Sequence, residues 1–484
     1  MKKFPETDTF IYIIFFGVCV FVLLQSPLAP YAKSIIGVDS GIYIYSARQI
    51  LNGQLMYKDI VDIKGPFLYF INAFALLIFN RHLIGIWFFE VFSLFAASII
   101  MYKTARLFAG KISSSMAVVG CLFLLMLCLQ RGNMTEEWSL PYISAALYIF
   151  ADYLKRNKPL TIVRLFILSL AFVLTFMLRA NLISLWAGFG IVLLIKWVKE
   201  KKYKELIRNL SVIVLFTALC VTPFFLYFYL TGTLSDAIYW VFTFNMFEYA
   251  SEINVFKSVL DTVVKISYVG IIIPFLIAIY MFFRDKTTVT AGILVSLVFT
   301  VLACSLGRGF WHYYVNFIPL LVIPYSYLFT IIKDNIHKKL YIFIFILFIA
   351  FNAVLVEKHS RRVYDNYFGK NERKLKMEKL TEIIDRNTKP SDEILVNGYR
   401  AYVYLYSNRT CATRFSHTQN ESAFVRENYK SDAEKALPKL IILDNVNYGD
   451  CFNLDSLLHD RYQLADSVDD NVIYWKMKIW KLKE

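Results

Sequence analysis

Long apolar segments recur along this 484-residue chain up to about residue 356, and they constrain its fold more than any other feature. A helix needs about 20 consecutive apolar residues to cross a bilayer. Only 18% of the residues are charged and 57% are hydrophobic, whereas soluble domains have about 25% charged residues. We therefore expect an α-helical, polytopic membrane protein with about eleven transmembrane helices. The segments lie at roughly 9–30, 83–102, 114–130, 138–153, 162–178, 182–198, 210–230, 264–283, 289–306, 313–332 and 340–356.

Clusters of lysine and arginine predict how these segments are oriented, because short cytoplasmic loops accumulate positive charge. With a cytoplasmic N-terminus, the inner loops receive the basic clusters at 103–111, 155–158, 196–204, 284–286 and 333–339. We therefore expect a multi-pass protein of the cell (plasma or inner) membrane, with everything after about residue 356 on the extracytoplasmic side. The net charge of +15 follows partly from this arrangement, and no basic soluble module indicates a nucleic-acid partner.

The first predicted outer loop, at about 33–82, contains a short apolar stretch at 67–79. About thirteen residues are few for a span, so we expect a juxtamembrane or re-entrant helix on the outer side. The sequence IYIYSARQIL at 42–51 predicts a second helix along the membrane interface. The alternative is that 67–79 crosses the bilayer, which would move every later loop to the opposite side.

The composition changes at about residue 357, where charged, helix-patterned sequence replaces the apolar segments. Short β-like runs follow at 392–398, 438–444 and 471–480, with a helical pattern at 401–407. We therefore divide the chain into a transmembrane catalytic domain, 1–356, and a small extracytoplasmic α/β domain, 357–484. The second domain shows no catalytic motif, so its expected role is to cover the site or bind an acceptor. Cys411 and Cys451 lie in its polar sequence, and their pairing is left open.

Residues 37–66, which we call the first polar segment, bring Asp39, Asp59, Asp62 and Lys64 together just after the first apolar segment. Ionisable groups at a bilayer face are costly unless they are solvated, paired or used, so these four are candidates for function. Simpler roles exist as well. Asp39 precedes a helix-like stretch, where Asp is a common N-cap, and Lys64 would also suit anchoring at the headgroups.

Other predicted outer turns add a second set of charged side chains. In the first of these turns we expect one glutamate to pair with Arg131. If the helices bundle, the outer turns converge around one cavity. Carboxylates accept a proton from an acceptor hydroxyl and cations stabilise a departing phosphate, so the combined set suits transfer from a lipid-linked phosphate. The charged residues of these turns are Arg131, Glu136, Glu137, Arg179, Arg308 and His312.

Several motifs resemble a known family. D-S-G at 39–41, followed by G-Q-L-M-Y-K-D-I-V-D-I-K-G-P at 53–66, is similar to the first outer loop of bacterial GT-C glycosyltransferases. That superfamily includes protein O-mannosyltransferases and the aminoarabinose transferase that acts on lipid A. N-M-T-E-E at 133–137 and H-Y-Y-V-N-F-I-P-L from His312 also resemble features of its uncharacterised bacterial members.

The resemblance implies inverting transfer of one sugar from a polyprenyl-phosphate donor to a lipid, glycan or protein acceptor outside the membrane. By position, Asp39 matches the family's catalytic aspartate, a general base, Lys64 matches a basic residue that contacts the donor phosphate, and Glu136 matches the acidic position of the second outer turn. Ser40 follows Asp39 where several relatives have a second acid, so a divalent metal is not predicted. The remaining candidates for substrate contact are Asp59, Asp62, Arg131, Arg179, Arg308 and His312.

Three other classes of membrane protein share some of these features. A transporter or flippase of lipid-linked saccharides also has many spans and cavity charges, but the sequence shows no internal repeat and no matched pair of Gly/Pro-broken helices. An O-antigen-ligase-like or polymerase enzyme uses the same kind of donor, with arginines and a histidine in place of an early Asp loop. A structural scaffold gives no reason for acids and cations to share one face.

Overall fold

A computed structural model describes residues 8–249, 254–268, 270–306, 309–335, 338–369, 372–418, 423–444, 454–468 and 477–483. The chain forms two compact units, each assembled from three stretches of sequence. The first unit, which we call the helical unit, contains residues 1–29, 86–226 and 252–364. The second, which we call the polar unit, contains residues 30–85, 227–251 and 365–484, and therefore combines the first polar segment with the C-terminal α/β sequence.

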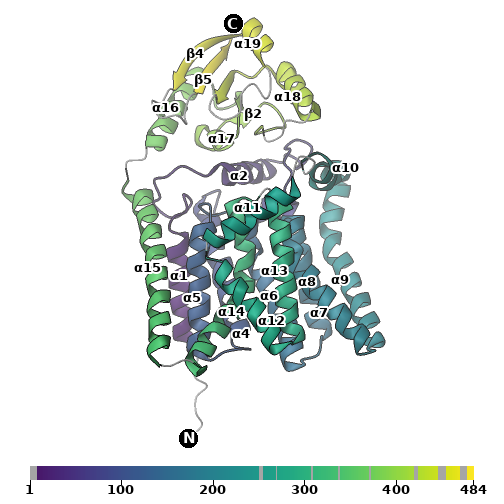
Figure 1. Cartoon of the computed structure of the whole chain (residues 1–484). Helices are drawn as coiled ribbons and strands as arrows, with labels where there is room; N and C mark the ends of the chain where they lie inside the picture. The colour runs from purple at the N-terminus through teal and green to yellow at the C-terminus, as the bar shows by residue number, and fades with distance from the viewer. Residues whose placement is uncertain are drawn as a thin grey trace. The chain divides into compact units, whose positions relative to one another are not determined.

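The helical unit is a bundle of long apolar helices that run side by side (Figure 1). Their apolar side chains pack against one another over much of their length, since Phe15, Cys121, Leu147 and Leu297 are fully buried. Its helices are α1 (Thr9–Leu23), α4 (Ile84–Ala105), α5 (Lys111–Cys128), α6 (Thr135–Arg156), α7 (Ile162–Leu178), η1 (Ala180–Ile183), α8 (Ser184–Lys199), α9 (Tyr203–Leu230), α11 (Val255–Tyr268), α12 (Ile272–Asp285), α13 (Thr288–Leu306), η4 (Trp311–Phe317), α14 (Ile318–Asn335) and α15 (Lys338–Tyr367).

Five helices of the described part are long and apolar enough to cross a membrane, or six if α11 and α12 form one broken span. The chain is thus mostly helical with several apolar helices, as predicted, while the count of about eleven spans stays a prediction. Three apolar helices are shorter than a full span: α1, α7 and α3 (Pro66–Ile78). The five long helices are α4, α5, α9, α13 and the continuous stretch Ala180–Lys199.

The prediction of one continuous helical segment at 264–283 is wrong, because two separate helices meet there at a sharp bend. Helix α11 ends at Tyr268, α12 begins at Ile272, and the two axes differ by 101°. Gly270 lies between them with a φ of +80°, a conformation that glycine adopts without steric cost. Its N–H bonds to the carbonyl of Ser267 and closes the end of α11.

The polar unit begins with two short helices from the predicted first outer loop, α2 (Val38–Leu51) and α3. Both were expected, and α3 begins with Pro66 because proline fits the first turn, where no N–H partner is needed. The other helices of this unit are α10 (Leu234–Ile238), the π-helical turns η2 (Tyr239–Thr243) and η3 (Asn245–Tyr249), α16 (Glu372–Asn387), α17 (Tyr402–Ser407), α18 (Ala423–Ala436) and α19 (Asp455–Arg461).

Within the described residues, a five-stranded sheet forms the core of the C-terminal sequence, in the order β2-β1-β3-β5-β4. The first three are parallel and β5 pairs antiparallel with both β3 and β4. Two expected strands appear in full, part of the third appears as β5, and the expected helix at 401–407 appears as α17. Residues 471–476 of the third run, like Cys451, lie outside the described residues. The strands are β1 (Glu393–Asn397), β2 (Thr410–Cys411), β3 (Leu440–Asp444), β4 (Tyr462–Val468) and β5 (Met477–Leu482).

Close packing of α8 against α13 generates a first prediction. A Cβ atom on the buried Gly188 would lie 2.5 Å from the backbone N and Cα of Ser296, whereas one on Gly190 would meet nothing within 4 Å. Both Gly188→Ala and Gly190→Ala gain helix propensity. We expect Gly188→Ala alone to destabilise the protein, by about 1–3 kcal/mol from overpacking. Thermal unfolding of the two detergent-solubilised variants tests this; equal midpoints would contradict the packing described.

Candidate active site

Asp39 lies in the first turn of α2, where Gly37 is the N-cap. It is therefore not the N-cap that its position in the sequence also allowed. Its side chain is half-buried, and among the described residues its carboxylate has no hydrogen-bond or ion-pair partner. The positive end of the helix dipole favours a negative charge in the first turn. An unpaired carboxylate at this place is free to accept a proton from a ligand.

Lys64 ends a loop whose backbone is fixed at successive residues. The N–H of Val61 donates to the carbonyl of Arg414 (2.8 Å), the side-chain amide of Asn245 donates to the carbonyl of Ile63 (2.8 Å) and the Tyr57 hydroxyl donates to the carbonyl of Lys64 (2.7 Å). Burial, and then the charge of Asp62, hold the pKa of Tyr57 well above its ordinary value, so this hydroxyl keeps its proton.

The Lys64 ammonium itself has no ion pair with any described residue. It is half-buried and precedes Gly65, the N-cap of α3, which begins at Pro66. The backbone is thus held in place while the charged group remains unpaired. This arrangement suits an anion that arrives with a ligand, because little ordering of the loop is needed on binding.

Asp59 and Asp62 differ from Asp39 in that both already have partners. Asp59 is exposed, and its carboxylate accepts a hydrogen bond from the N–H of Leu55 (2.9 Å) in a closed turn. Asp62 is only 3% exposed, and its Oδ1 accepts from the N–H of Ile63 (2.6 Å). Both carboxylates therefore shape the loop, and contact with substrate stays a prediction for them.

Helix α2, which carries Asp39, and helix α3, which follows Lys64, contact each other in the polar unit. The rings of Tyr43 and Tyr69 meet edge to face, with centroids 6.3 Å apart. Tyr43 lies one helical turn after Asp39, and Tyr69 lies in the first turn of α3, just after Lys64. The N-terminal halves of the two helices are therefore neighbours, and each begins near one of the two unpaired charges.

Glu136 and Arg179 form a buried ion pair in the helical unit. Glu136 is fully buried in the first turn of α6, and Arg179 follows the last residue of α7. The Arg179 guanidinium donates to Glu136 Oε1 (2.9 Å) and to the Tyr313 hydroxyl (2.6 Å), and it lies 4.1 Å from the centre of the Tyr313 ring. Thr135 donates to the other carboxylate oxygen of Glu136 (2.7 Å). Both oxygens of Glu136 are thus occupied.

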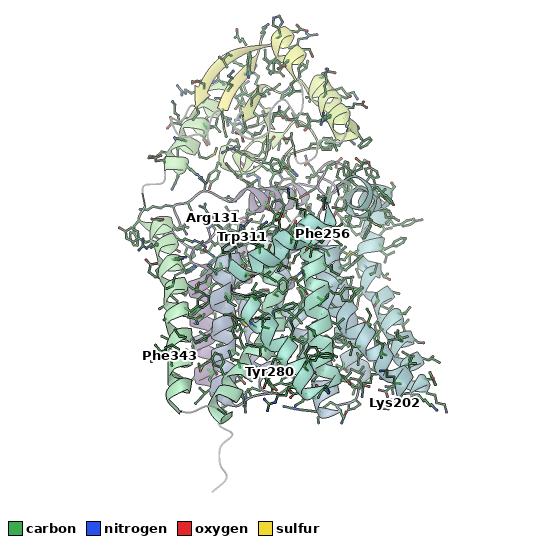
Figure 2. All side chains as sticks on the ribbon, viewed as in Figure 1. Arg131, Lys202, Phe256, Tyr280, Trp311 and Phe343 are labelled. Carbon is green, nitrogen blue, oxygen red and sulfur yellow. The ribbon has the colours of Figure 1, made fainter. Side chains whose placement is uncertain are left out.

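The turn at 130–134 lies beside η4 at one end of the bundle. His312 is 8% exposed, and its Nδ1 is 3.1 Å from the side-chain oxygen of Gln130. Figure 2 shows Arg131 and Trp311 at the same end of the helices, opposite Lys202. Two predicted outer turns therefore share one end of this unit. Arg131 is exposed, and Arg308 lies outside the described residues.

Two contributors to this cluster were missed in the sequence. Tyr313 was part of a recognised motif, but only its contact with Arg179 shows why a tyrosine stands there. Glu90 lies in α4, and its buried carboxylate accepts a hydrogen bond from the N–H of Asn133 and so fixes the 130–134 turn. The sequence could have indicated Glu90, because an acidic residue inside an apolar segment usually has a structural or functional role.

A scan against protein-family models finds no match, and a search of curated proteins finds no match either. Solved structures do match. The structure of ArnT from Cupriavidus metallidurans bound to undecaprenyl phosphate superposes with a TM-score of 0.61 at 12% identity and covers 98% of this chain and 97% of its own. Oligosaccharyltransferase AglB from Archaeoglobus fulgidus, with an inhibitory peptide and a dolichol-phosphate, gives 0.58 at 13% and covers 90% and 69%.

The chain has the GT-C fold. The resemblance inferred from the first polar segment is therefore confirmed for the fold, and the ArnT match extends through the C-terminal sequence. With its apolar helices, a GT-C fold indicates a multi-pass membrane protein. The convergence of the charged turns of the two units on one cavity stays a prediction.

Another neighbour, the Archaeoglobus fulgidus oligosaccharyltransferase, was solved with Zn and sulfate and matches with a TM-score of 0.57, 14% identity and coverage of 90% of this chain and 68% of its own. No three His, Cys, Asp or Glu side chains within the described ranges are grouped so that they could hold a metal ion, and Ser40 follows Asp39. We derive no catalytic step through a metal.

The Glu136–Arg179 pair generates a second prediction. Arg179→Gln leaves the Glu136 charge buried without its partner, and such a loss costs about 3–5 kcal/mol. Adding Glu136→Gln removes the stranded charge, so the double variant should recover much of this loss of stability. Thermal unfolding of the two single variants and the double variant measures the coupling. Additive losses would show that the two side chains do not depend on each other.

Proposed function

We propose that this GT-C protein is a membrane glycosyltransferase that moves one sugar from a polyprenyl-phosphate-linked donor to an extracytoplasmic acceptor, with inversion. One observation carries the proposal. Within the first polar segment, Asp39 and Lys64 are half-buried and have no charged partner among the described residues, whereas Asp59 and Asp62 are engaged by the loop. A proton acceptor and a phosphate-binding cation are the two groups that this transfer needs.

The reaction assigned to these residues is a single displacement. The Asp39 carboxylate takes the proton from an acceptor hydroxyl while the oxygen of that hydroxyl forms a bond to the anomeric carbon of the sugar. The bond between that carbon and the phosphate oxygen breaks, and the lipid phosphate leaves with the electron pair. Lys64 stabilises the negative charge that grows on the phosphate. Attack opposite the leaving group inverts the anomeric centre.

The donor class is supported by the ligands of the neighbours with this fold. ArnT was solved with undecaprenyl phosphate and AglB with a dolichol-phosphate and a peptide. In this proposal Glu136 positions Arg179 instead of acting on the substrate, because both of its oxygens are occupied. Arg179, Arg131, His312 and Arg308 are proposed as further contacts to substrate. A lipid, a glycan or a protein would each supply an acceptor hydroxyl.

Replacing the proposed base generates a third prediction. Asp39→Asn keeps the size of the side chain and removes its basicity, so turnover should fall by about 10²–10⁴-fold. Binding of undecaprenyl phosphate should stay unchanged, because the variant keeps Lys64. Transfer from a panel of polyprenyl-phosphate sugars and binding of the lipid phosphate are both measured with the purified, full-length protein.

Asp59→Asn is the comparison for this experiment, because Asp59 is an exposed carboxylate of the same segment that closes a turn. It should lose far less turnover than Asp39→Asn. Full activity of Asp39→Asn would disprove the assignment of the base. Equal losses in the two variants would show that the segment responds to any change of charge.

The proposed phosphate contact generates a fourth prediction. Lys64→Met should weaken binding of undecaprenyl phosphate about tenfold or more, since a hydrogen bond to a charged group contributes about 1.5–3 kcal/mol. Lys58→Met removes an exposed lysine of the same segment and serves as the control. Titration of both variants with the lipid phosphate measures the effect. Unchanged affinity in Lys64→Met would place the phosphate elsewhere.

A further inference from the structure

Residues 401–418 of the C-terminal sequence lie against two parts of the first polar segment: helix α2 and the loop at 61–64. Three contacts hold α2. A Cβ on Gly41 would lie 2.9 Å from the Cβ of Tyr402, the rings of Tyr45 and Tyr404 are 4.9 Å apart, and the Tyr45 hydroxyl accepts a hydrogen bond from the N–H of Cys411 (2.8 Å). Helix α2 thus packs on α17 with no room for a side chain at position 41.

The same stretch of the C-terminal sequence also holds the loop before Lys64. The carbonyl of Arg414 accepts the N–H of Val61 (2.8 Å), and Nε2 of His417 lies 4.0 Å from Oδ1 of Asp62. The His417 and Asp62 side chains are 4% and 2% exposed. Asp62 is two residues from Lys64, so contacts that hold Asp62 also restrict where the backbone of Lys64 lies.

The buried carboxylate of Asp62 is the reason why His417 matters to this loop. Asp62 has one oxygen bonded to the N–H of Ile63, while its other oxygen, Oδ2, has no hydrogen-bond partner among the described residues. A buried carboxylate with an unsatisfied oxygen is costly unless a positive or polar group stands nearby. The imidazole of His417 is a polar group beside this carboxylate, with Nε2 4.0 Å from Oδ1, and its Nδ1 lies 3.4 Å from the Ser416 hydroxyl.

We propose that residues 401–418 act as a template that holds α2 and the 61–64 loop in place, with His417 as a positioning residue for Lys64. The template would orient Lys64 toward the phosphate of the donor, so this inference rests on the proposed function. It assigns the C-terminal domain a part in donor binding, beyond covering the site or binding an acceptor. The same contacts hold the helix that carries Asp39, so one template sets both proposed reactive groups.

Two measurements on the full-length protein test the template. The first is hydrogen exchange of the backbone at 61–65 in His417→Ala, which should speed up relative to the wild type. The control is His459→Ala, because His459 is a 92% exposed histidine of the same C-terminal sequence. If His417→Ala does not accumulate, His417→Gln keeps a hydrogen-bonding group beside Asp62 and should show a smaller change in the same direction.

The second measurement is binding of undecaprenyl phosphate in two backgrounds. His417→Ala should weaken binding about tenfold with Lys64 present, because displacement of a positioned group is costly, and less than about twofold in the Lys64→Met background. A general structural role would lower affinity by the same factor in both backgrounds. Equal factors would therefore overturn the positioning role.

The remaining outcomes separate this inference from the proposed function. Unchanged exchange at 61–65 in His417→Ala would overturn the template, even in an active enzyme. Failure of the wild type to bind the lipid phosphate would overturn the proposed function and, with it, the role given to Lys64. Faster exchange together with a loss of affinity that depends on Lys64 would support both.

Discussion

The need to pair buried charge determines how this molecule is arranged around its polar residues. Glu136 is fully buried and is held by Arg179 and Thr135. Asp62 is buried between the N–H of Ile63 and the ring of His417. Glu136 has both oxygens paired and Asp62 has one, so the protein itself holds both acids, and they can shape the loops and turns around them. Asp39 and Lys64 differ from these acids, because no described residue pairs with either charge.

Much of the fold could be predicted from the sequence, since it depends on patterns that are local. The apolar helices, the short helix α3 and strands β1 and β3 all follow from runs of apolar residues. Strand β4 was missed because a bulge between Leu464 and Asp466 interrupts its alternation. The break between α11 and α12 was missed because one glycine conformation, at Gly270, overrides a continuous apolar pattern.

The candidate site was predictable only in part, because some of its contacts join residues far apart in the sequence. The first polar segment showed its acids and Lys64 together, and Asp39 and Lys64 ranked first because of their resemblance to a family motif. The pairing of Glu136 with Arg179 joins residues 43 positions apart, where no spacing rule applies. The contact of Asp62 with His417 joins residues 355 positions apart. Such contacts depend on tertiary packing and leave no local signal.

An experimental structure of the full-length protein in a lipid nanodisc with undecaprenyl phosphate tests the central claim most directly. The account predicts that the phosphate lies within hydrogen-bond distance of the Lys64 ammonium, with the Asp39 carboxylate facing the space beside it. A phosphate bound by other cations, with Lys64 directed away from it, would contradict the account.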